Sequence, residues 1–269
     1  MITKKEIIKE LENFNIPKGK IVTVHTSLKK VGEIEGGGET LLSSLVEVFT
    51  KDGGILCVPT HTWDSDIYDL RKSESCIGTL PRLAASHKEA FRTLHPTHSM
   101  AVFGEEERVK RFIENEEKAD TPANPKGCYG KIYEEDGYVI LIGVGHDKNT
   151  YIHFVEELLG VPDRLTKEKA EKTIIHKDGR EEKRYLYWFD EAKIPDVSVY
   201  FPKFEPAFRY HSCIEDAALG NAPVQICSAR KMKEVIELIY SRNSMKELLD
   251  NDRALDEKLY KGNTLYEKL

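Results

Sequence analysis

The segment 143–156, with the sequence GVGHDKNTYIHFVE, combines residue types suited to proton transfer with a helix that would hold them. A helix capped by Asn149 or Thr150 places His153 in its first turns and Glu156 three residues later on the same face. The positive helix end disfavours an imidazolium, whereas a nearby carboxylate favours it. A histidine poised in this way suits general-base catalysis, and the alternative is a hydrogen-bonded core histidine.

A second segment could bind an anion where a predicted strand ends and a glycine-rich turn opens a helix. Its residues are His25, Thr26, Ser27, Leu28, Gly36 and Gly37. Exposed N–H groups and the dipole of the following helix favour a phosphate there. Spacing alone favours a plainer interpretation, a turn that needs glycine for positive φ. The segment is neither a Walker loop nor a GxGxxG motif, so nucleotide hydrolysis and dinucleotide binding are poorly supported.

Three carboxylates follow the predicted strand 55–58. Asp64, Asp66 and Asp69 lie in the stretch that begins PTHTWDSD. Side chains at the carboxyl ends of strands line ligand crevices in α/β sheets, so these residues would make a crevice suited to a cationic substrate. The alternative is a solvated acidic loop.

The stretch HPTHS contains His95, His98 and Ser99 and could in principle bind a metal. Pro96 prevents a regular helix, and no carboxylate follows at the spacing of HExxH, so a structural or ligand-binding role is favoured over a metal role. The five cysteines form no CxxC pair, which is typical of a protein in a reducing cytoplasm. Cys76 and Cys128 keep a cysteine acyl-enzyme open as a competing mechanism.

The elements that must position these residues alternate along the chain. Apolar spacing predicts helices and strands, and Asp178-Gly179 predicts a hairpin within the region 170–210. The expected helices are 3–15, 39–50, 78–87, 105–117, 149–159 and 230–240. The expected strands are 21–24, 55–58, 100–103, 138–144 and 224–227, with 174–175 and 184–189 in the hairpin. This order predicts an α/β fold with a mixed central sheet flanked by helices, an added antiparallel hairpin, and one domain over residues 1–269.

Composition narrows the function classes further. The 269 residues are 40% hydrophobic and 32% charged, with a net charge of −6. This balance argues against a broad nucleic-acid interface, which needs a basic face. The sequence has no run of 18 apolar residues and no signal-peptide pattern at its start, so we expect no membrane span and a cytoplasmic protein.

Four stretches, taken in order, resemble the aminoglycoside 3-N-acetyltransferase family. They are VHTSLKKVG with the following GGG, DGGILCVPTHTWD, HPTHSMAVFG and DGYVILIGVGHDKNTYIHFVEE. They span residues 21–157, and the pattern GVGHDxNTxxH is the most specific of them. One departure is the stretch 125–130, PKGCYG, where many relatives carry a Gly-x-Gly-Ser-Pro segment; this difference concerns local cofactor contacts.

The resemblance implies an acyltransferase that moves an acetyl group from acetyl-CoA to an amine, with a fold distinct from that of the GNAT acetyltransferases and with no metal. It places His153 at the catalytic histidine and Glu156 at the acidic residue that follows it. It places carboxylates on the substrate side, of which Asp64 is the nearest match and is also assigned to catalysis. The residues assigned to substrate binding are Asp64, Asp66, Glu156 and Asp190. The residues assigned to the cofactor are His25, Thr26, Ser27, Leu28, Gly36, Gly37, His95 and Ser99.

The predicted activity is acetylation of the 3-amino group of aminoglycoside antibiotics, with direct transfer and His153 as base. The alternatives are an N-acyltransferase for another amine metabolite, a metal hydrolase using His61, His95, His98 and His146, and a non-catalytic CoA-binding module. The expected partners are the amine and CoA, without nucleic acid or membrane, and a homodimer is left open.

Overall fold

The computed structural model describes residues 1–192, 195–243 and 251–262. Its helices are α1 (Lys4–Glu12), α2 (Leu28–Val31), α3 (Gly37–Phe49), α4 (Thr79–Ser86), α5 (Glu106–Ile113), α6 (Cys128–Glu134), α7 (Tyr151–Leu158), α8 (Glu205–Tyr210) and α9 (Ala229–Arg242). Its strands are β1 (Ile21–Thr26), β2 (Ile55–Pro59), β3 (Ile67–Asp69), β4 (Phe91–Arg92), β5 (Met100–Phe103), β6 (Tyr138–Ile142), β7 (Ala170–Ile175), β8 (Glu181–Leu186), β9 (Ile214–Leu219) and β10 (Ala222–Ser228). No helix in these described ranges is both long and apolar enough to span a membrane.

The main sheet has the strand order β4-β5-β2-β1-β6-β10-β9. Strand β1 pairs in parallel with β2 and β6, and the pairs β2·β5, β6·β10 and β9·β10 are antiparallel. The sheet is therefore mixed, as the sequence predicts. Because β1, β2 and β6 are parallel neighbours, their carboxyl ends meet at one edge of the sheet.

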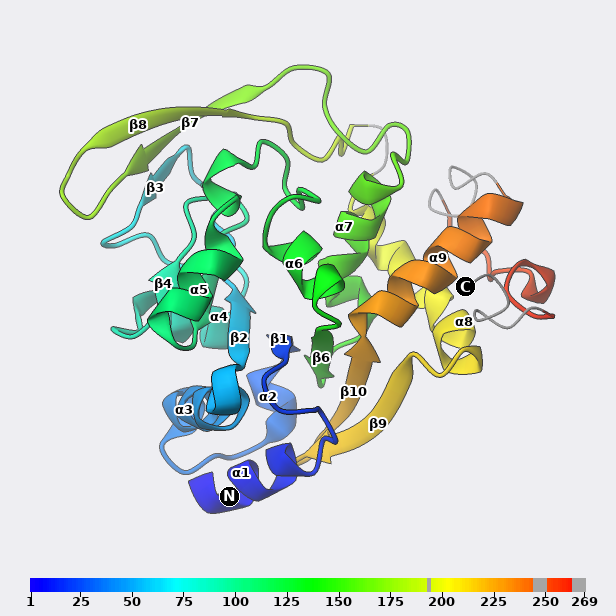
Figure 1. Cartoon of the computed structure of the whole chain (residues 1–269), viewed down its shortest axis with the longest axis horizontal. Helices are drawn as coiled ribbons and strands as arrows, with labels where there is room; N and C mark the ends of the chain where they lie inside the picture. Colours follow the sequence, from blue (N-terminus) through cyan, green and yellow to red (C-terminus); the bar gives the residue numbers. More distant parts are fainter. Residues whose placement is uncertain (193–194, 244–250, 263–269) are drawn as a thin grey trace.

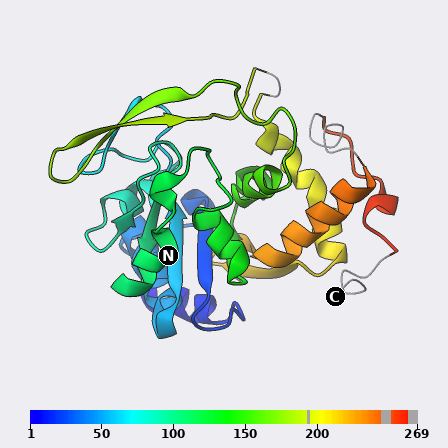
Figure 2. The ribbon, with the colours of Figure 1, turned by 45° about the horizontal axis from the view of Figure 1, so that its top comes forward.

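Side-chain alternation gives the sheet two apolar faces. In β1, Ile21 packs with the helices α5 to α9, whereas Val22 and Val24 pack with α1, α3 and α4. Successive strand residues point to opposite faces, so a fully apolar strand covers both cores. The helices α7, α8 and α9 group together beyond β6, away from the N-terminal helices (Figure 2).

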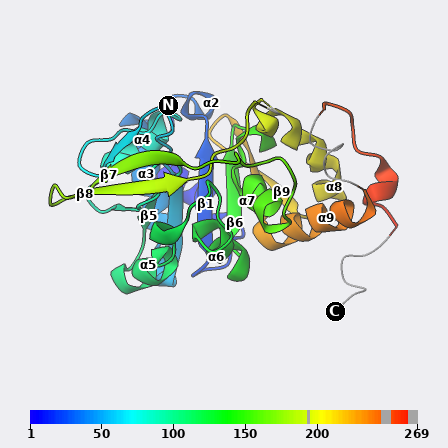
Figure 3. The same ribbon diagram turned by 90° about the horizontal axis from the view of Figure 1, so that it is seen from above.

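The hairpin β7–β8 forms a second, three-stranded sheet with β3, in the order β3-β7-β8. It projects as a long arm from the body of the molecule (Figure 1), and from above it crosses the strands of the main sheet (Figure 3). The prediction of an added antiparallel hairpin is confirmed. The sequence did not predict β9, whose exposed Glu215 and Asp216 interrupt the apolar pattern.

Helix starts follow local chemistry. The Thr3 side chain caps α1 in a capping box with Glu6, and the Ser228 hydroxyl caps α9. The helix expected over residues 105–117 is shorter in the structure. Helix α5 ends at Ile113, and Glu116 in the next turn is buried, where its carboxylate accepts the Cys128 backbone N–H at 2.6 Å.

Candidate active site

His153 lies in the first turn of α7, beside the carboxyl edge of β1, β2 and β6, and its partner is Glu156. The Nδ1 atom lies 3.0 Å from Glu156 Oε2. The other carboxylate oxygen, Oε1, lies 3.3 Å from Arg164 Nε. The Glu156 and Arg164 side chains are only 1% and 4% exposed, so this pair is enclosed within the fold. The Asn149 side chain holds the helix start by accepting the Tyr151 backbone N–H at 3.2 Å.

The Glu156 contact determines which nitrogen of His153 can act as a base. An ionised carboxylate only accepts hydrogen bonds, so Nδ1 must carry the proton that it donates to Glu156. In a neutral imidazole, Nε2 then bears the free lone pair. The His153 side chain is 12% exposed, which leaves a small part of the ring accessible. This arrangement can accept a proton from a substrate held beside the ring.

Aromatic rings hold the imidazole of His153 on two sides. Phe189 stacks on it with ring centroids 4.3 Å apart, and Phe201 meets it edge-on at 4.8 Å. The bridge between Leu165 and Phe189 ties the segment after β8 to the loop that carries Arg164. Arg164 and Phe189 could not be identified from the sequence, because no local spacing links either residue to His153.

Four other histidines surround this position, and we refer to His25, His61, His95, His98 and His153 as the imidazole cluster. The rings of His61 and His98 are 4.5 Å apart, and His98 lies 5.6 Å from Phe189. Trp63, which is 42% exposed, covers His61 at 4.8 Å. The cluster therefore runs from the buried strand ends to an exposed aromatic ring.

Burial keeps the surrounding imidazoles neutral. It lowers the pKa of His25 and of His95 to about 4, and it lowers the pKa of His61 and of His98 well below the usual range. Both ring nitrogens of His61 and the Nε2 atom of His25 are buried without a hydrogen-bond partner in the described chain. Buried polar atoms of this kind are normally satisfied, so a bound ligand with matching groups would fit here.

Three residues assigned from the resemblance, His95, Ser99 and Glu156, are buried and have partners within the chain. His95 Nδ1 accepts the His98 backbone N–H at 2.9 Å, and Nε2 lies 3.0 Å from the Thr121 carbonyl, so both nitrogens are used by the chain. The buried Ser99 hydroxyl bonds to Thr60 and to Arg92. The assignment of His95 and Ser99 to the cofactor stays a prediction, as does that of Glu156 to the substrate.

The acidic loop, residues 64–69, is less negative than its sequence predicts. Asp66 accepts a hydrogen bond from Lys172 Nζ at 2.7 Å. Asp69 is buried, and its hydrogen bonds with Arg71 lower its pKa to about 2. Asp64 stays exposed, and the described residues offer it no ion pair. Asp190 is half-buried, and its backbone N–H binds the Arg164 carbonyl at 2.8 Å.

The segment assigned to the cofactor begins next to the imidazole cluster and then leaves it. His25 and Thr26 end β1, Ser27 precedes α2, and Leu28 begins α2. The Thr26 hydroxyl is buried without a partner among the described residues, as is His25 Nε2. Gly36 and Gly37 have φ of 74° and 67° and are exposed where the turn passes into the start of α3, as the plainer interpretation of these glycines requires. Their contact with a cofactor stays a prediction.

The cysteines give little support to an acyl-enzyme. Burial raises the pKa of Cys57 and Cys128 well above the usual range. Burial and the nearby Asp64 raise the pKa of Cys76, whose thiol donates to the His61 carbonyl at 3.2 Å. A reactive cysteine needs a lowered pKa, and these three are shifted the other way.

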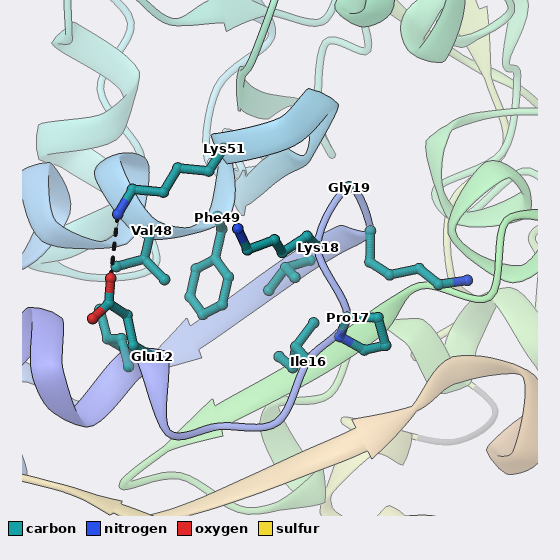
Figure 4. Close-up of a pocket in the computed structure, with 11 residues that line it drawn as sticks. Glu12, Ile16, Pro17, Lys18, Gly19, Val48, Phe49 and Lys51 are labelled. Carbon is teal, nitrogen blue, oxygen red and sulfur yellow. Dashed lines mark hydrogen bonds and ion pairs between the residues drawn. The ribbon is translucent and has the colours of Figure 1, made fainter.

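Two other features bear on the choice of site. A surface pocket of about 270 Å³ lies at the start of β1, at the opposite end of the strand from His25 (Figure 4). Its Lys18 and Lys51 are paired with Asp52 and Glu12, so it presents no concentrated positive charge. Within the described residues, no three His, Cys, Asp or Glu side chains are grouped so that they could hold a metal ion.

The chain is similar in sequence to known acetyltransferases over most of its length. The family described as aminoglycoside 3-N-acetyltransferase matches residues 23–240. The prophage-derived aminoglycoside N(3')-acetyltransferase-like protein YokD of Bacillus subtilis is 26% identical over 57% of this chain and 64% of the relative. Aminoglycoside N(3)-acetyltransferase IV of a Salmonella species is 28% identical over 59% of this chain and 60% of the relative. The matches thus span under two thirds of the length of these relatives.

Solved structures share the fold over most of the chain. YokD from Bacillus subtilis aligns with a TM-score of 0.74 at 20% identity, covering 90% of this chain and 100% of that one. AAC-IIIb, solved as a binary complex with CoASH, aligns with a TM-score of 0.76 at 18% identity, covering 90% and 97%. The expected mixed α/β fold, distinct from the GNAT type, is confirmed. Since the family match covers most of the sequence, the chain belongs to the aminoglycoside 3-N-acetyltransferase family.

Proposed function

We propose that this protein transfers an acetyl group from acetyl-CoA to an amine, with the 3-amino group of an aminoglycoside as the acceptor class. The observation that carries the proposal is the pairing of partly exposed His153 with buried Glu156, in which Nδ1 faces the carboxylate at 3.0 Å and Nε2 is left to act as a base. Family membership supports the reaction class. Two relatives support the ligands, because AAC-IIIb was solved with CoASH and AAC(3)-IVa with a gentamicin.

In this proposal, acetyl-CoA supplies the acetyl group as a thioester. An acceptor amine is mostly protonated at neutral pH and becomes a nucleophile only when a base takes its proton. His153 Nε2 accepts that proton, and Glu156 stabilises the imidazolium that results. The free amine then attacks the thioester carbonyl, the C–N bond forms as the C–S bond breaks, and the CoA thiolate leaves and takes up the proton that the acetylated nitrogen loses. Arg164 holds the Glu156 carboxylate in place, and Phe189 and Phe201 fix the plane of the imidazole ring.

The residues around His153 fit a bound thioester and amine. The partnerless polar atoms of His25, Thr26 and His61 lie at the strand ends, where they can bind amide or carbonyl groups of the pantetheine arm. Exposed Asp64 and half-buried Asp190 are left to attract a cationic acceptor. Direct transfer is favoured over an acyl-enzyme, because the shifts in cysteine pKa oppose thiolate formation.

A second acceptor class, a metabolite amine that is not an antibiotic, is favoured by the Lys172–Asp66 pair, which removes negative charge from the acidic loop.

A thiol-release assay tests the proposal. Wild-type protein is incubated with acetyl-CoA and kanamycin-, gentamicin- or neomycin-type compounds beside simple amines. We expect amine-dependent CoA release, and mass spectrometry without amine should find no acetyl-cysteine. Release that no amine increases would contradict the proposed function, and an acetylated Cys76 or Cys128 would contradict direct transfer.

A further inference from the structure

The acidic loop contains a cation of the chain's own. Lys172 in β7 is 4% exposed, and its ammonium donates to the Ser65 carbonyl at 2.9 Å and to Asp66 Oδ1 at 2.7 Å. The same ammonium lies 4.4 Å from the centre of the Trp188 ring. A carboxylate, a carbonyl and an aromatic face are the groups that recognise an ammonium ion. The fold thus fills an ammonium site with its own side chain.

Strand register fixes this placement. Ile67 in β3 pairs with Thr173 in β7, and the Thr173 backbone N–H donates to the Asp66 carbonyl at 2.9 Å. Lys172 is therefore opposite the acidic loop whenever the small sheet is formed. Trp188 precedes Phe189, which stacks on His153, so one short segment connects the Lys172 site to the imidazole cluster.

The electrostatic consequence is a weaker attraction for cations. Asp66 is 88% exposed, but the hydrogen bond and the charge of Lys172 lower its pKa and also compensate its charge. The field of an ion pair falls off faster with distance than that of a single charge, and salt screens it further. Asp69 is likewise paired with Arg71. Of the loop's three carboxylates, Asp64 alone is without an ion pair among the described residues.

We propose that Lys172 sets the charge preference of the acceptor site, so that aminoglycosides and other amines with fewer positive charges bind better than more highly charged ones. This inference rests on the proposed function, and it narrows the substrate class of the same site. In the wild type, Lys172 already compensates the charge of Asp66 and covers the face of Trp188, so neither group is available to a further positive charge of the acceptor. An acceptor with one amine, which binds near His153, needs neither group.

Intrinsic fluorescence can measure acceptor binding without turnover, because Trp63 and Trp188 are the only two tryptophans and both lie in this region. Wild type, Lys172→Met and Lys169→Met are titrated with a neomycin-type polycation and with a simple monoamine. Lys169 is the matched control, since it also lies on an aromatic ring, that of Tyr187 at 4.9 Å, and pairs with Asp120. The Lys172→Met substitution keeps the length of the side chain and removes its charge.

We expect Lys172→Met to lower the Kd of the polycation about tenfold, because the Asp66 carboxylate is left uncompensated and no ammonium of the chain competes with the acceptor at the Trp188 ring. The Kd of the monoamine should stay within about twofold, and Lys169→Met should change neither value. An unchanged ratio of the two Kd values in Lys172→Met, an equal shift in Lys169→Met, or no fluorescence response to any amine would overturn the inference.

A second variant covers the case in which Lys172→Met does not fold. Asp66→Asn keeps the ammonium and removes its countercharge, so the Kd of the polycation should rise while that of the monoamine stays constant. An unchanged polycation Kd in Asp66→Asn would also count against the inference. Failure of the proposed function appears separately, as absence of CoA release despite measurable binding.

Discussion

The imidazole cluster and the acidic loop lie side by side, yet they control charge in opposite ways. In the cluster, His25, His61 and His98 are buried, and burial is the main cause that lowers the pKa of each ring, with a further contribution from neighbouring imidazoles at His61 and His98. In the loop, Lys172 lowers the pKa of the exposed Asp66 carboxylate and compensates its charge. The comparison shows that charge in one region is set by desolvation and in the other by pairing.

Glu156 combines both conditions, since it is buried like the imidazoles and paired like the loop carboxylates. Its position makes it the link between His153, which would change charge during the reaction, and Arg164, which does not. Substitutions at these residues therefore test whether burial and ion pairing set the charge of side chains independently of each other.

The largest expected effect comes from removing the base itself. We expect His153→Ala to lower kcat by about 10²–10⁴-fold, because the acceptor amine then loses its proton only to solvent. Acetyl-CoA binding should change little. The measurement is steady-state thiol release together with a Kd for CoA. A variant with near-wild-type turnover would show that His153 is not the base.

The next effect concerns the buried countercharge. We expect Arg164→Met to lower the free energy of unfolding by about 3–5 kcal/mol, because removing one member of a buried ion pair leaves the other uncompensated. Arg164→Lys, which keeps a charge, should lose less. Urea unfolding of both variants measures this difference. Equal losses would show that the shape of the arginine, and not its charge, supports Glu156.

The contacts of Glu156 differ in whether they can be predicted from the sequence. The i,i+3 spacing of His153 and Glu156 can be identified from the sequence because helix geometry alone brings them together. Arg164 and Phe189 meet the pair through irregular segments, for which no periodic pattern exists. Lys172 and Asp66 are 106 residues apart, and only the register of β3 on β7 joins them. Local periodicity predicted the mixed sheet and its main helices, whereas the pairings that set charge are non-local.

A third prediction compares a buried group with a paired one by the number of protons that the protein takes up on unfolding. Folding lowers the pKa of His25 from 6.5 to about 4, so between these values the unfolded chain binds a proton that the folded chain does not. Above pH 6.5, His25 therefore does not lower the free energy of unfolding. As the pH falls from 6.5 to about 4, the free energy of unfolding decreases by about 1.4 kcal/mol per pH unit.

Calorimetric unfolding in buffers of different ionisation enthalpy measures this uptake. At about pH 5, His25→Gln should take up about one proton fewer than wild type on unfolding. Asp66→Asn should leave the uptake nearly unchanged, since that carboxylate is ionised in both states at this pH. Equal changes in proton uptake for the two substitutions would show that the imidazole cluster and the acidic loop do not differ in this way.

The smallest expected effect tests the one loop carboxylate without an ion pair among the described residues. Asp64→Asn should raise the KM of a polycationic amine about threefold and leave kcat unchanged, because an exposed charge contributes less than about 1 kcal/mol. Asp52→Asn, at the opposite end of the main sheet, is the matched control and should change neither constant. The effect of Asp64→Asn should disappear at high salt, as expected for an exposed charge. A fall in kcat would instead place Asp64 beside the reacting atoms, and control of charge in the loop would then belong to catalysis as well as to binding.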